Sequence, residues 1–326
     1  MDGKNKRINF DVCYLGATKQ IPYLVRAIRE QMPYAKMNVC YSDYTGEEQE
    51  GILESDLKWE GIENEVNILT SSNWRRNKNS MEVEFGVSNS QYSMEYRQIG
   101  FHIDSLKFEK RRLLNAEEIQ KLKKKYSITS EKVILWGSVN SSEIGLCLDN
   151  VMRLKEKQSK KRRTQTIIAP RQSPHDIIEK LRDSNINFTT DQELKKADCI
   201  VITKKGILDK LYSVCDIAIL GEGQNPLEPA FYNKRTLVPH RGRNNDLAYE
   251  GLEKSGLLEI IDKSEIDYEI WKKISPLYLE ICGERAQKFI ASQQGAAKKY
   301  AKIIQLGLYD KMNHEEWREL INSPLN

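Results

Sequence analysis

The segment Ile217–Ala230 reads IAILGEGQNPLEPA and contains a complete strand, turn and helix start. The four apolar residues at its beginning predict a short buried strand. Gly221 and Gly223 then allow a tight turn and a close approach of the backbone to a neighbouring group. Pro226 suits the first turn of a helix, and Asn225 is a candidate for the residue that caps it. The segment therefore predicts a strand that turns directly into a helix.

The same alternation of short apolar runs and amphipathic segments extends outward in both directions, over residues 133–306. Strands that alternate with helices pair in parallel and need helices on both faces of their sheet, so the predicted fold class is α/β. The predicted strands are Val133–Trp136, Thr166–Ala169, Cys199–Ile202, Ile217–Leu220, Arg235–Val238 and Leu258–Ile261. The predicted helices are 142–156, Pro174–Asp183, a segment ending at Val214, Leu227–Tyr232, Leu247–Ser255, Glu265–Cys282 and Glu284–Leu306.

The first hundred residues predict a shorter α/β region. Asn9–Leu15 and Met37–Tyr41 read as strands on either side of a helix at Gln20–Gln31, and Asn67–Thr70 is a further candidate strand. Polar residues dominate from 71 to 108, where alternation predicts a β-hairpin or meander.

We therefore expect two lobes. The first is a short lobe over residues 1–118, and the second is the regular lobe over residues 119–326. The boundary lies near a charged surface helix predicted at Ala116–Tyr126.

The composition bounds the function. The chain has 326 residues, with 51 Lys and Arg against 47 Asp and Glu, which gives a net charge of +4. That charge is too small for a dedicated nucleic-acid binder. No apolar run approaches the roughly 18 residues of a membrane span, and the start lacks the apolar core of a signal peptide. The six cysteines form no CxxC pair and the four histidines lie far apart. We expect a cytoplasmic protein without a metal centre.

Ligands of open α/β sheets bind beyond the carboxyl ends of the strands. This rule points to Gly16, Gly137-Ser138, Pro170-Arg171, Lys205-Gly206 and the segment Gly221–Glu228.

Glu228 is the most informative of these positions. It lies one turn inside a helix whose N-terminal N–H groups suit a phosphate, and its carboxylate could accept hydrogen bonds from two ribose hydroxyls. The alternative is a well-capped helix in which Glu228 only interacts with the helix dipole. Arg171 also has an alternative, as a surface residue at a helix start.

The segment Gly221–Ala230 resembles the GGHNPLEPA signature of the bacterial 3-deoxy-D-manno-octulosonic acid (Kdo) transferases. These are GT-B glycosyltransferases that use a CMP-activated sugar and act on lipid A precursors. Further similarities follow in chain order over residues 133–306. They are Trp136-Gly137-Ser138 (AGS in the family), Ala169-Pro170-Arg171-Gln172 (VPRH), Gly206-Ile207-Leu208 with Leu211-Tyr212 (GEL…LY), Asn244 (Asn-Phe), and Gly283-Glu284-Arg285-Ala286 with Gln294-Gly295-Ala296 (GERA…GA).

This resemblance implies a GT-B-like fold, with two Rossmann-like lobes, a cleft between them and a last helical segment that crosses back to the first lobe. It implies a nucleotide-sugar donor bound without a metal ion or cofactor, because helix ends and basic side chains can take the phosphate charge. In this reading Arg171 pairs with the phosphate and Glu228 holds the ribose. The implied donor-binding residues are Gly137, Ser138, Arg171, Lys205, Gly206, Ile207, Gly223, Gln224, Asn225 and Glu228.

The N-terminal half departs from the family. Tyr14-Leu15-Gly16-Ala17 falls where the family carries Ser-x-Gly-Glu, and that Glu is assigned as its general base. Ala17 cannot accept a proton. Candidates for a relocated base are Asp43 and Glu47 (or its neighbour Glu48) near the second N-terminal strand, and Glu222 from the second lobe. Each has the alternative of a solvated surface carboxylate.

Two main functions remain open. The chain is a glycosyltransferase that moves a sugar, CMP-linked by the resemblance, to a glycan or lipid-linked acceptor. Alternatively, it is an inactive relative that binds a nucleotide-sugar or a protein, as Ala17 suggests. A third reading, in which donor binding is also lost, ranks last. The basic run 155–163 is a solvated loop or a contact with anionic lipid head groups. Its basic residues are Lys155, Lys157, Lys160, Lys161, Arg162 and Arg163.

Overall fold

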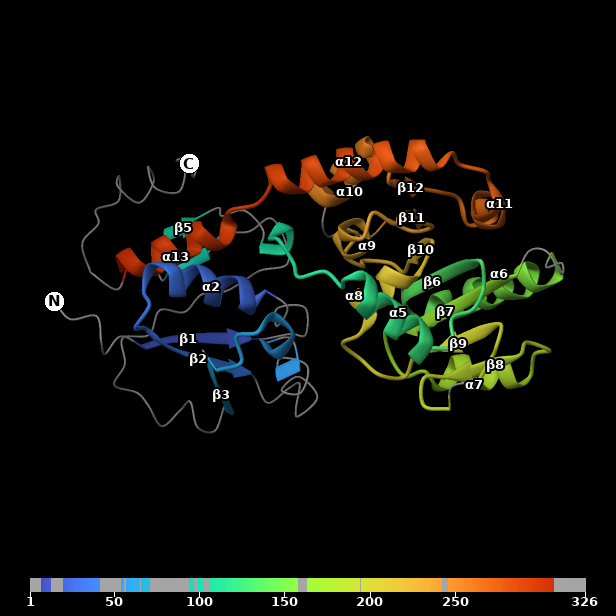
Figure 1. Cartoon of the computed structure of the whole chain (residues 1–326), viewed down its shortest axis with the longest axis horizontal. Helices are drawn as coiled ribbons and strands as arrows, with labels where there is room; N and C mark the ends of the chain where they lie inside the picture. Colours follow the sequence, from blue (N-terminus) through green and yellow to red (C-terminus); the bar gives the residue numbers. More distant parts are fainter. Residues whose placement is uncertain are drawn as a thin grey trace. The chain divides into compact units, whose positions relative to one another are not determined.

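The computed structural model describes residues 7–12, 20–41, 54–55, 57–64, 66–70, 94–96, 99–101, 106–157, 163–193, 195–241 and 246–307 (Figure 1). The chain divides into two compact units. Unit 1 consists of Met1–Lys110 and Ala291–Asn326, and unit 2 of Arg111–Ile290. The sequence-based boundary at 118/119 instead falls inside the helix α5 (Ala116–Lys125), which packs within unit 2.

Unit 1 is built on a three-stranded parallel sheet in the order β1-β2-β3. The helix α2 (Ile21–Gln31) connects β1 (Arg7–Val12) to β2 (Lys36–Tyr41), and β3 (Val66–Thr70) pairs with β2. The predicted β-α-β unit and the candidate third strand are therefore confirmed.

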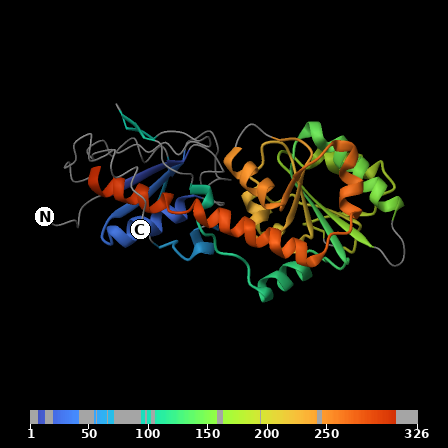
Figure 2. The same ribbon diagram turned by 90° about the horizontal axis from the view of Figure 1, so that it is seen from above.

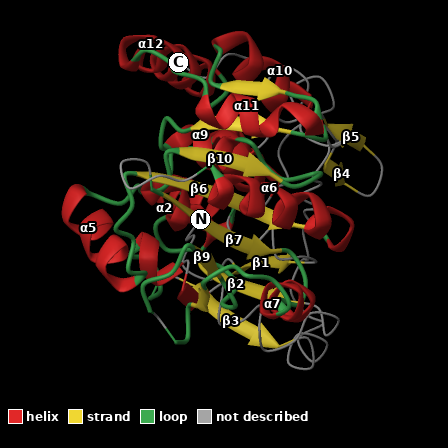
Figure 3. Cartoon of the chain, turned by 90° about the vertical axis from the view of Figure 1, so that its right-hand side faces the viewer, coloured by secondary structure: helices red, strands yellow, loops and turns green. Residues whose placement is uncertain are grey.

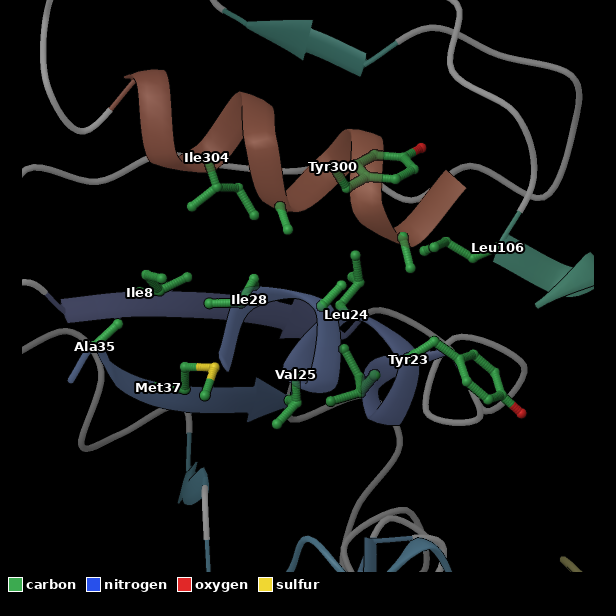
Figure 4. Packing of buried hydrophobic residues seen from close by; sticks show 14 of the residues in the cluster. Ile8, Tyr23, Leu24, Val25, Ile28, Ala35, Met37, Leu106, Tyr300 and Ile304 are labelled. Carbon is green, nitrogen blue, oxygen red and sulfur yellow. The ribbon is translucent and has the colours of Figure 1, made fainter. Parts of the chain in front are cut away.

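The core of unit 1 brings together segments from both ends of the chain. The helix α13 (Ala296–Gly307) packs against α2. Glu109 holds the start of α13, because its Oε1 accepts hydrogen bonds from the backbone N–H groups of Gly295 (3.0 Å) and Ala297 (2.8 Å). The buried side chains labelled in Figure 4 are Ile8, Tyr23, Leu24, Val25, Ile28, Ala35, Met37, Leu106, Tyr300 and Ile304.

A short antiparallel hairpin lies in the polar region of unit 1. It pairs β4 (Met94–Tyr96) with β5 (Ile99–Phe101), as the alternation there predicts. Residues 71–93 lie outside the described part of the chain.

Unit 2 contains a seven-stranded parallel sheet in the order β12-β11-β10-β6-β7-β9-β8. Figure 3 labels four neighbouring strands of this sheet, β10, β6, β7 and β9. The predicted strands are all confirmed. The strands are β6 (Lys132–Val139), β7 (Thr164–Pro170), β8 (Phe188–Thr190), β9 (Cys199–Val201), β10 (Ile217–Leu220), β11 (Arg235–Val238) and β12 (Leu258–Ile260). The remaining helices are α6 (Ile144–Glu156), α7 (His175–Arg182), α8 (Leu208–Leu211), α9 (Leu227–Phe231), α10 (Asp246–Ser255), α11 (Ile266–Trp271) and α12 (Pro276–Ser292).

Both faces of this sheet are buried. On one face, Trp136 and Ile168 belong to a cluster that includes residues of α6, α7 and α11. Residues of the opposite pleat, such as Leu135 and Ile167, are equally buried. Figure 2 shows helices on both sides of these strands. The near-continuous apolar strands of the sequence are explained by this double burial.

The helices after β12 differ from the prediction. The predicted helix Glu265–Cys282 is wrong, because the chain leaves α11 at Trp271 and restarts at Pro276, which cannot continue a preceding helix. The predicted helix Glu284–Leu306 is interrupted at Gly295, whose φ of 110° is outside the helical range. Strand β8 was not predicted, because only its middle residue is buried. Among the described residues, no helix has the length and apolar composition required to cross a bilayer.

Candidate functional site

The strand order of unit 2 reverses next to β6. From β6 the chain proceeds to β7 and then to the β8–β9 edge, and it returns to place β10 on the other side of β6. Such a topological switch point leaves a crevice beyond the carboxyl ends of the two central strands. Here those ends are Gly137-Ser138 after β6 and the turn Gly221–Gly223 after β10, both predicted from the sequence as ligand positions.

The two turns approach each other closely. The backbone N–H of Gly221 donates to the carbonyl oxygen of Gly137 at 3.0 Å. A Cβ on Gly221 would lie 2.4 Å from the Ser138 carbonyl oxygen, so this position requires glycine. Ser138 has φ 60° at an irregularity in the β6–β7 pairing. A non-glycine residue in this conformation is strained, which is common at functional sites.

Glu143 links the two turns and was missed by the sequence analysis. Its Oε2 accepts a hydrogen bond from the backbone N–H of Asn140 (2.9 Å), and its Oε1 accepts one from that of Glu222 (2.8 Å). The spacing of Asn140 and Glu143 is that of a capping box, which is the signal that could have indicated the first bond. The second bond spans 79 residues, and only the fold reveals it.

Arg171 reaches the same place from the end of β7. Its Nη1 donates to the carbonyl oxygen of Glu222 at 3.1 Å. Gly223, in the left-handed region with φ 74°, lies beside the guanidinium. The structure thus brings the exposed guanidinium of Arg171 to the glycine turn at the switch point.

The start of α9 is fixed by side chains. The helix begins at Leu227, so the N-cap is Pro226, and the prediction that Asn225 caps the helix is wrong by one residue. The Oδ1 of Asn225 nevertheless accepts a hydrogen bond from the N–H of Leu227 (3.1 Å). The hydroxyl of Tyr249 donates to the carbonyl oxygen of Gln224 at 3.0 Å. Burial raises the pKa of Tyr249 to about 12, so this hydroxyl is protonated at neutral pH. These contacts hold the predicted signature segment in one conformation.

Glu228 is buried, with 7% of its side chain exposed, and it has a cationic neighbour that the sequence analysis did not identify. The Nη1 of Arg111 lies 3.8 Å from its Oε1. Tyr212 lies nearby: burial, and then the Glu228 carboxylate, raise the pKa of Tyr212 well above its usual range. The Tyr212 hydroxyl in turn approaches Gly137, where a Cβ would lie 2.4 Å from it. Glu228 is therefore close to the switch point.

The segment Lys205–Ile207 lies in the turn between β9 and α8. Gly206 has φ 80°, which explains the glycine there. Leu208, the first residue of α8, lies against Gly137, since its Cδ1 would be 3.5 Å from a Cβ at that glycine. The turn after β9 is thus a third strand end that lies near Gly137.

The candidates for the general base are only partly described. Glu222 is half exposed, and its Oε1 lies 3.7 Å from Nε2 of His240, a residue just after β11 that the sequence analysis did not select. Ala17, Asp43 and Glu47 lie outside the described residues, and so does Asn244.

The basic run is partly engaged within unit 2. Lys155 donates to the carbonyl oxygen of Asn185, and Lys157 Nζ lies 3.5 Å from Asp267 Oδ2. Arg163 is exposed. Lys160, Lys161 and Arg162 lie outside the described residues. In the part of the chain that the structure covers, no three His, Cys, Asp or Glu side chains are grouped so that they could hold a metal ion.

The sequence of the chain is similar to part of one known glycosyltransferase. No protein-family profile matches the chain. A bifunctional glycosyltransferase/methyltransferase of Fusobacterium nucleatum is 30% identical over 152 residues, which cover 42% of this chain and 23% of that protein. The chain thus spans about a quarter of this relative.

Solved structures that cover most of the chain share its fold. A candidate UDP-N-acetylglucosamine 2-epimerase of Listeria monocytogenes has a TM-score of 0.54 at 12% identity, covering 94% of this chain and 97% of its own. Anabaena HepE in complex with UDP and glucose has 0.54 at 11% identity, covering 94% and 100%. A Rickettsia africae glycosyltransferase has 0.51 at 14% identity, covering 98% and 100%. At these identities the likeness shows the fold alone, and that fold is the α/β architecture of GT-B glycosyltransferases.

Proposed function

We propose that the chain is a glycosyltransferase whose unit 2 binds a nucleotide-activated sugar at the switch point between β6 and β10. The carrying observation is the meeting of three strand-end segments, Gly137-Ser138, Arg171 and Gly221–Gly223. The buried carboxylate of Glu228 lies near Tyr212, whose hydroxyl approaches Gly137. Glycines and a cation suit a phosphate, and a fixed carboxylate suits a ribose. The 30% identity to a protein with a glycosyltransferase activity supports the same reaction class.

The finer proposal is a CMP-linked sugar and a glycan or lipid-linked acceptor. It is supported by the NPLEPA segment, which contains Asn225 and Glu228 and resembles the signature of the Kdo transferases. UDP-linked donors are the competing choice, since HepE was solved with UDP. We also propose that the basic run, including Arg163 and its neighbours, contacts an anionic membrane.

The transfer reaction has a simple balance. An acceptor hydroxyl oxygen forms a bond to the anomeric carbon of the sugar, while the bond from that carbon to the phosphate oxygen breaks. The nucleotide leaves with the bonding electrons, and the hydroxyl proton passes to a base. Unit 2 offers Glu222 for this role, with His240 as its neighbour. If Glu222→Gln leaves turnover unchanged, this assignment fails.

A second candidate is a relative that binds the nucleotide-sugar without transferring it. The observation that favours it is Ala17, at the position where the family carries its general base. Hydrolysis of a nucleotide-sugar, or its transfer to any glycan extract, excludes this second candidate.

A thermal-shift panel tests donor binding. CMP, CDP, UDP, GDP and ADP are compared on the wild type and on Glu228→Gln. A ligand at 100 times its Kd adds about 2.7 kcal/mol to the free energy of unfolding, which raises Tm by several degrees in a protein of this size. We expect selective stabilisation by CMP that is lost in Glu228→Gln. Glu117→Gln, an exposed glutamate in the first turn of α5, is the matched control and should respond like the wild type. Absence of any shift refutes the proposed function.

A further inference from the structure

Glu143 is fixed between the two turns that meet at the switch point. It is the N-cap residue of α6, the helix that follows β6. Its two carboxylate oxygens accept hydrogen bonds from different turns, Oε2 from the N–H of Asn140 at 2.9 Å and Oε1 from the N–H of Glu222 at 2.8 Å. A Cβ on Gly221 would lie only 2.7 Å from Oε2. The carboxylate is therefore packed directly against the glycine turn after β10.

Another helix start in unit 2 shows what a glutamate at this position does locally. In the capping box that leads into α11, the N–H of Asp262 donates to Glu265 Oε2 at 3.3 Å. Glu143 makes the corresponding bond to Asn140, but its second oxygen also reaches a turn 79 residues further along the chain. The local bond is sufficient to cap a helix start, so the long-range bond requires a further explanation.

The place of this carboxylate in the fold supplies that explanation. In doubly wound sheets that bind dinucleotides, the pyrophosphate lies on the turn after the first strand and on N–H groups at the start of the next helix. In unit 2 the first strand is β6 and the next helix is α6, and the Glu143 carboxylate already lies there. Its oxygens accept from N–H groups of both turns, as the oxygens of a bound phosphate would. The protein thus supplies an anion of its own to this place.

We propose that Glu143 is a specificity-determining residue that occupies the place of a second phosphate. The site then takes a nucleoside monophosphate, or a sugar linked to one, in preference to a nucleoside diphosphate. This inference rests on the proposed function. A second phosphate would meet a negative charge that already holds the N–H groups, and like charges so close repel each other. The exposed guanidinium of Arg171, which donates to the carbonyl oxygen of Glu222 at 3.1 Å, suits the one remaining phosphate.

The experiment measures the ratio of the Kd for CDP to the Kd for CMP by calorimetry on the full chain. The same ratio for UDP and UMP reports the phosphate preference independently of the base. Loss of a hydrogen bond to a charged group corresponds to a factor of about ten in affinity, so we expect a wild-type ratio of about ten or more. Glu143→Gln removes the charge, and its amide can accept from only one of the two N–H groups through its oxygen. CDP should therefore bind this variant more tightly than the wild type, with a ratio near one.

A second variant and a matched control complete the experiment. Glu143→Ser also removes the carboxylate, and serine is a favoured N-cap residue, so this variant decides if Glu143→Gln does not fold. Glu265→Gln loses the same kind of capping bond at the turn that follows the edge strand β12, and it should keep the wild-type ratio. Circular dichroism and Tm establish that each variant is folded.

The outcomes separate the inference from the function on which it rests. A lower Tm with an unchanged ratio in the Glu143 variants overturns the inference and leaves a structural contact. A ratio that falls only because CMP binds more weakly also overturns it, since Glu143 would then merely hold the turn. A wild type that binds diphosphates as well as monophosphates, or better, overturns it too, although nucleotide binding stands.

The uridine nucleotides separate the phosphate preference from the choice of base. Preference for UMP over UDP without binding of CMP supports the inference and contradicts only the cytosine of the proposed donor. A wild type that binds none of these nucleotides refutes the proposed function and, with it, this inference.

Discussion

Among the described residues of unit 2, two buried arginine–glutamate pairs differ in geometry and in their place on the sheet. Arg235, the first residue of β11, has 3% of its side chain exposed, and it donates to Glu259 Oε1 at 2.7 Å and to the carbonyl oxygen of Glu269 at 2.5 Å. It also bonds the Glu269 carboxylate directly. Arg111 instead faces Glu228 at 3.8 Å, close to the turns at the carboxyl ends of β6 and β10.

The difference separates a structural pair from a candidate functional one. The Glu269 carboxylate is occupied, because Lys272 Nζ also donates to its two oxygens at 3.1 and 3.0 Å. Such a network lies at the amino end of a strand, where ligands of α/β sheets do not bind. The Glu228 pair is looser and lies at the end where they do. Burial beside an arginine therefore does not by itself identify a site, and it is the position at the carboxyl ends of the strands that makes Glu228 a candidate.

The largest effect is expected at the structural pair. Arg235→Ala leaves the carboxylates of Glu259 and Glu269 without their arginine, and breaking a buried pair in this way costs about 3–5 kcal/mol. Urea unfolding at pH 7 measures this loss. The variant that remains folded should bind CMP like the wild type. A loss below about 1 kcal/mol would contradict the structural role of the pair.

A smaller effect on stability but a complete effect on ligand binding is expected at the candidate functional pair, Arg111 and Glu228. Glu228→Gln keeps the size of the side chain and removes the charge that faces Arg111. It should abolish the stabilisation of about 2.7 kcal/mol that CMP provides at 100 times its Kd. The measurement is the Tm with and without CMP. If CMP stabilised the variant as much as the wild type, Glu228 would not contact the ligand. The two pairs would then not differ in function.

The packing beside Glu228 provides the next prediction. Gly137→Ala would bring a Cβ to within 2.4 Å of the Tyr212 hydroxyl, and such overpacking costs about 1–3 kcal/mol. The double variant Gly137→Ala with Tyr212→Phe removes the clashing oxygen. It should recover much of the loss in a double-mutant cycle measured by urea unfolding. Additive losses would mean that Tyr212 does not limit this position.

The smallest effect is the pH dependence of the structural pair. Burial alone would raise the pKa of Glu269, but hydrogen bonds from Lys272 and Arg235 outweigh it and hold this pKa below the ordinary 4.5. Ionised Glu269 therefore stabilises the fold above pH 4.5, and this contribution is lost as pH falls through the lowered pKa. The difference in unfolding free energy between the wild type and Glu269→Gln should shrink between pH 5 and pH 3. A difference that stays constant over this range would contradict the lowered pKa.

Local patterns were sufficient to predict most of the fold. The apolar runs of β6, β7, β10 and β11 are buried on both faces, so their sequence signal was strong. The break before Pro276 was missed because the amphipathic pattern continues on both sides of it. The short edge strand β8 left almost no signal.

Candidate-site residues that belong to one continuous motif could be predicted, whereas those that depend on contacts between distant segments could not. The strand-end rule and the NPLEPA segment led to Gly137, Arg171 and Glu228. Arg111 was missed because nothing local marks it and Glu228 lies 117 residues away (228 − 111). For Glu143, the capping-box spacing marks only the bond to Asn140, whereas the bond to Glu222 spans 79 residues.

The most direct test of the central claim is a crystal structure of the full chain with CMP. The account predicts the ribose hydroxyls within hydrogen-bond distance of the Glu228 carboxylate, and the phosphate beside the turns at Gly137-Ser138 and Gly221–Gly223. A nucleotide bound elsewhere, or one bound there with its ribose turned away from Glu228, would contradict the account.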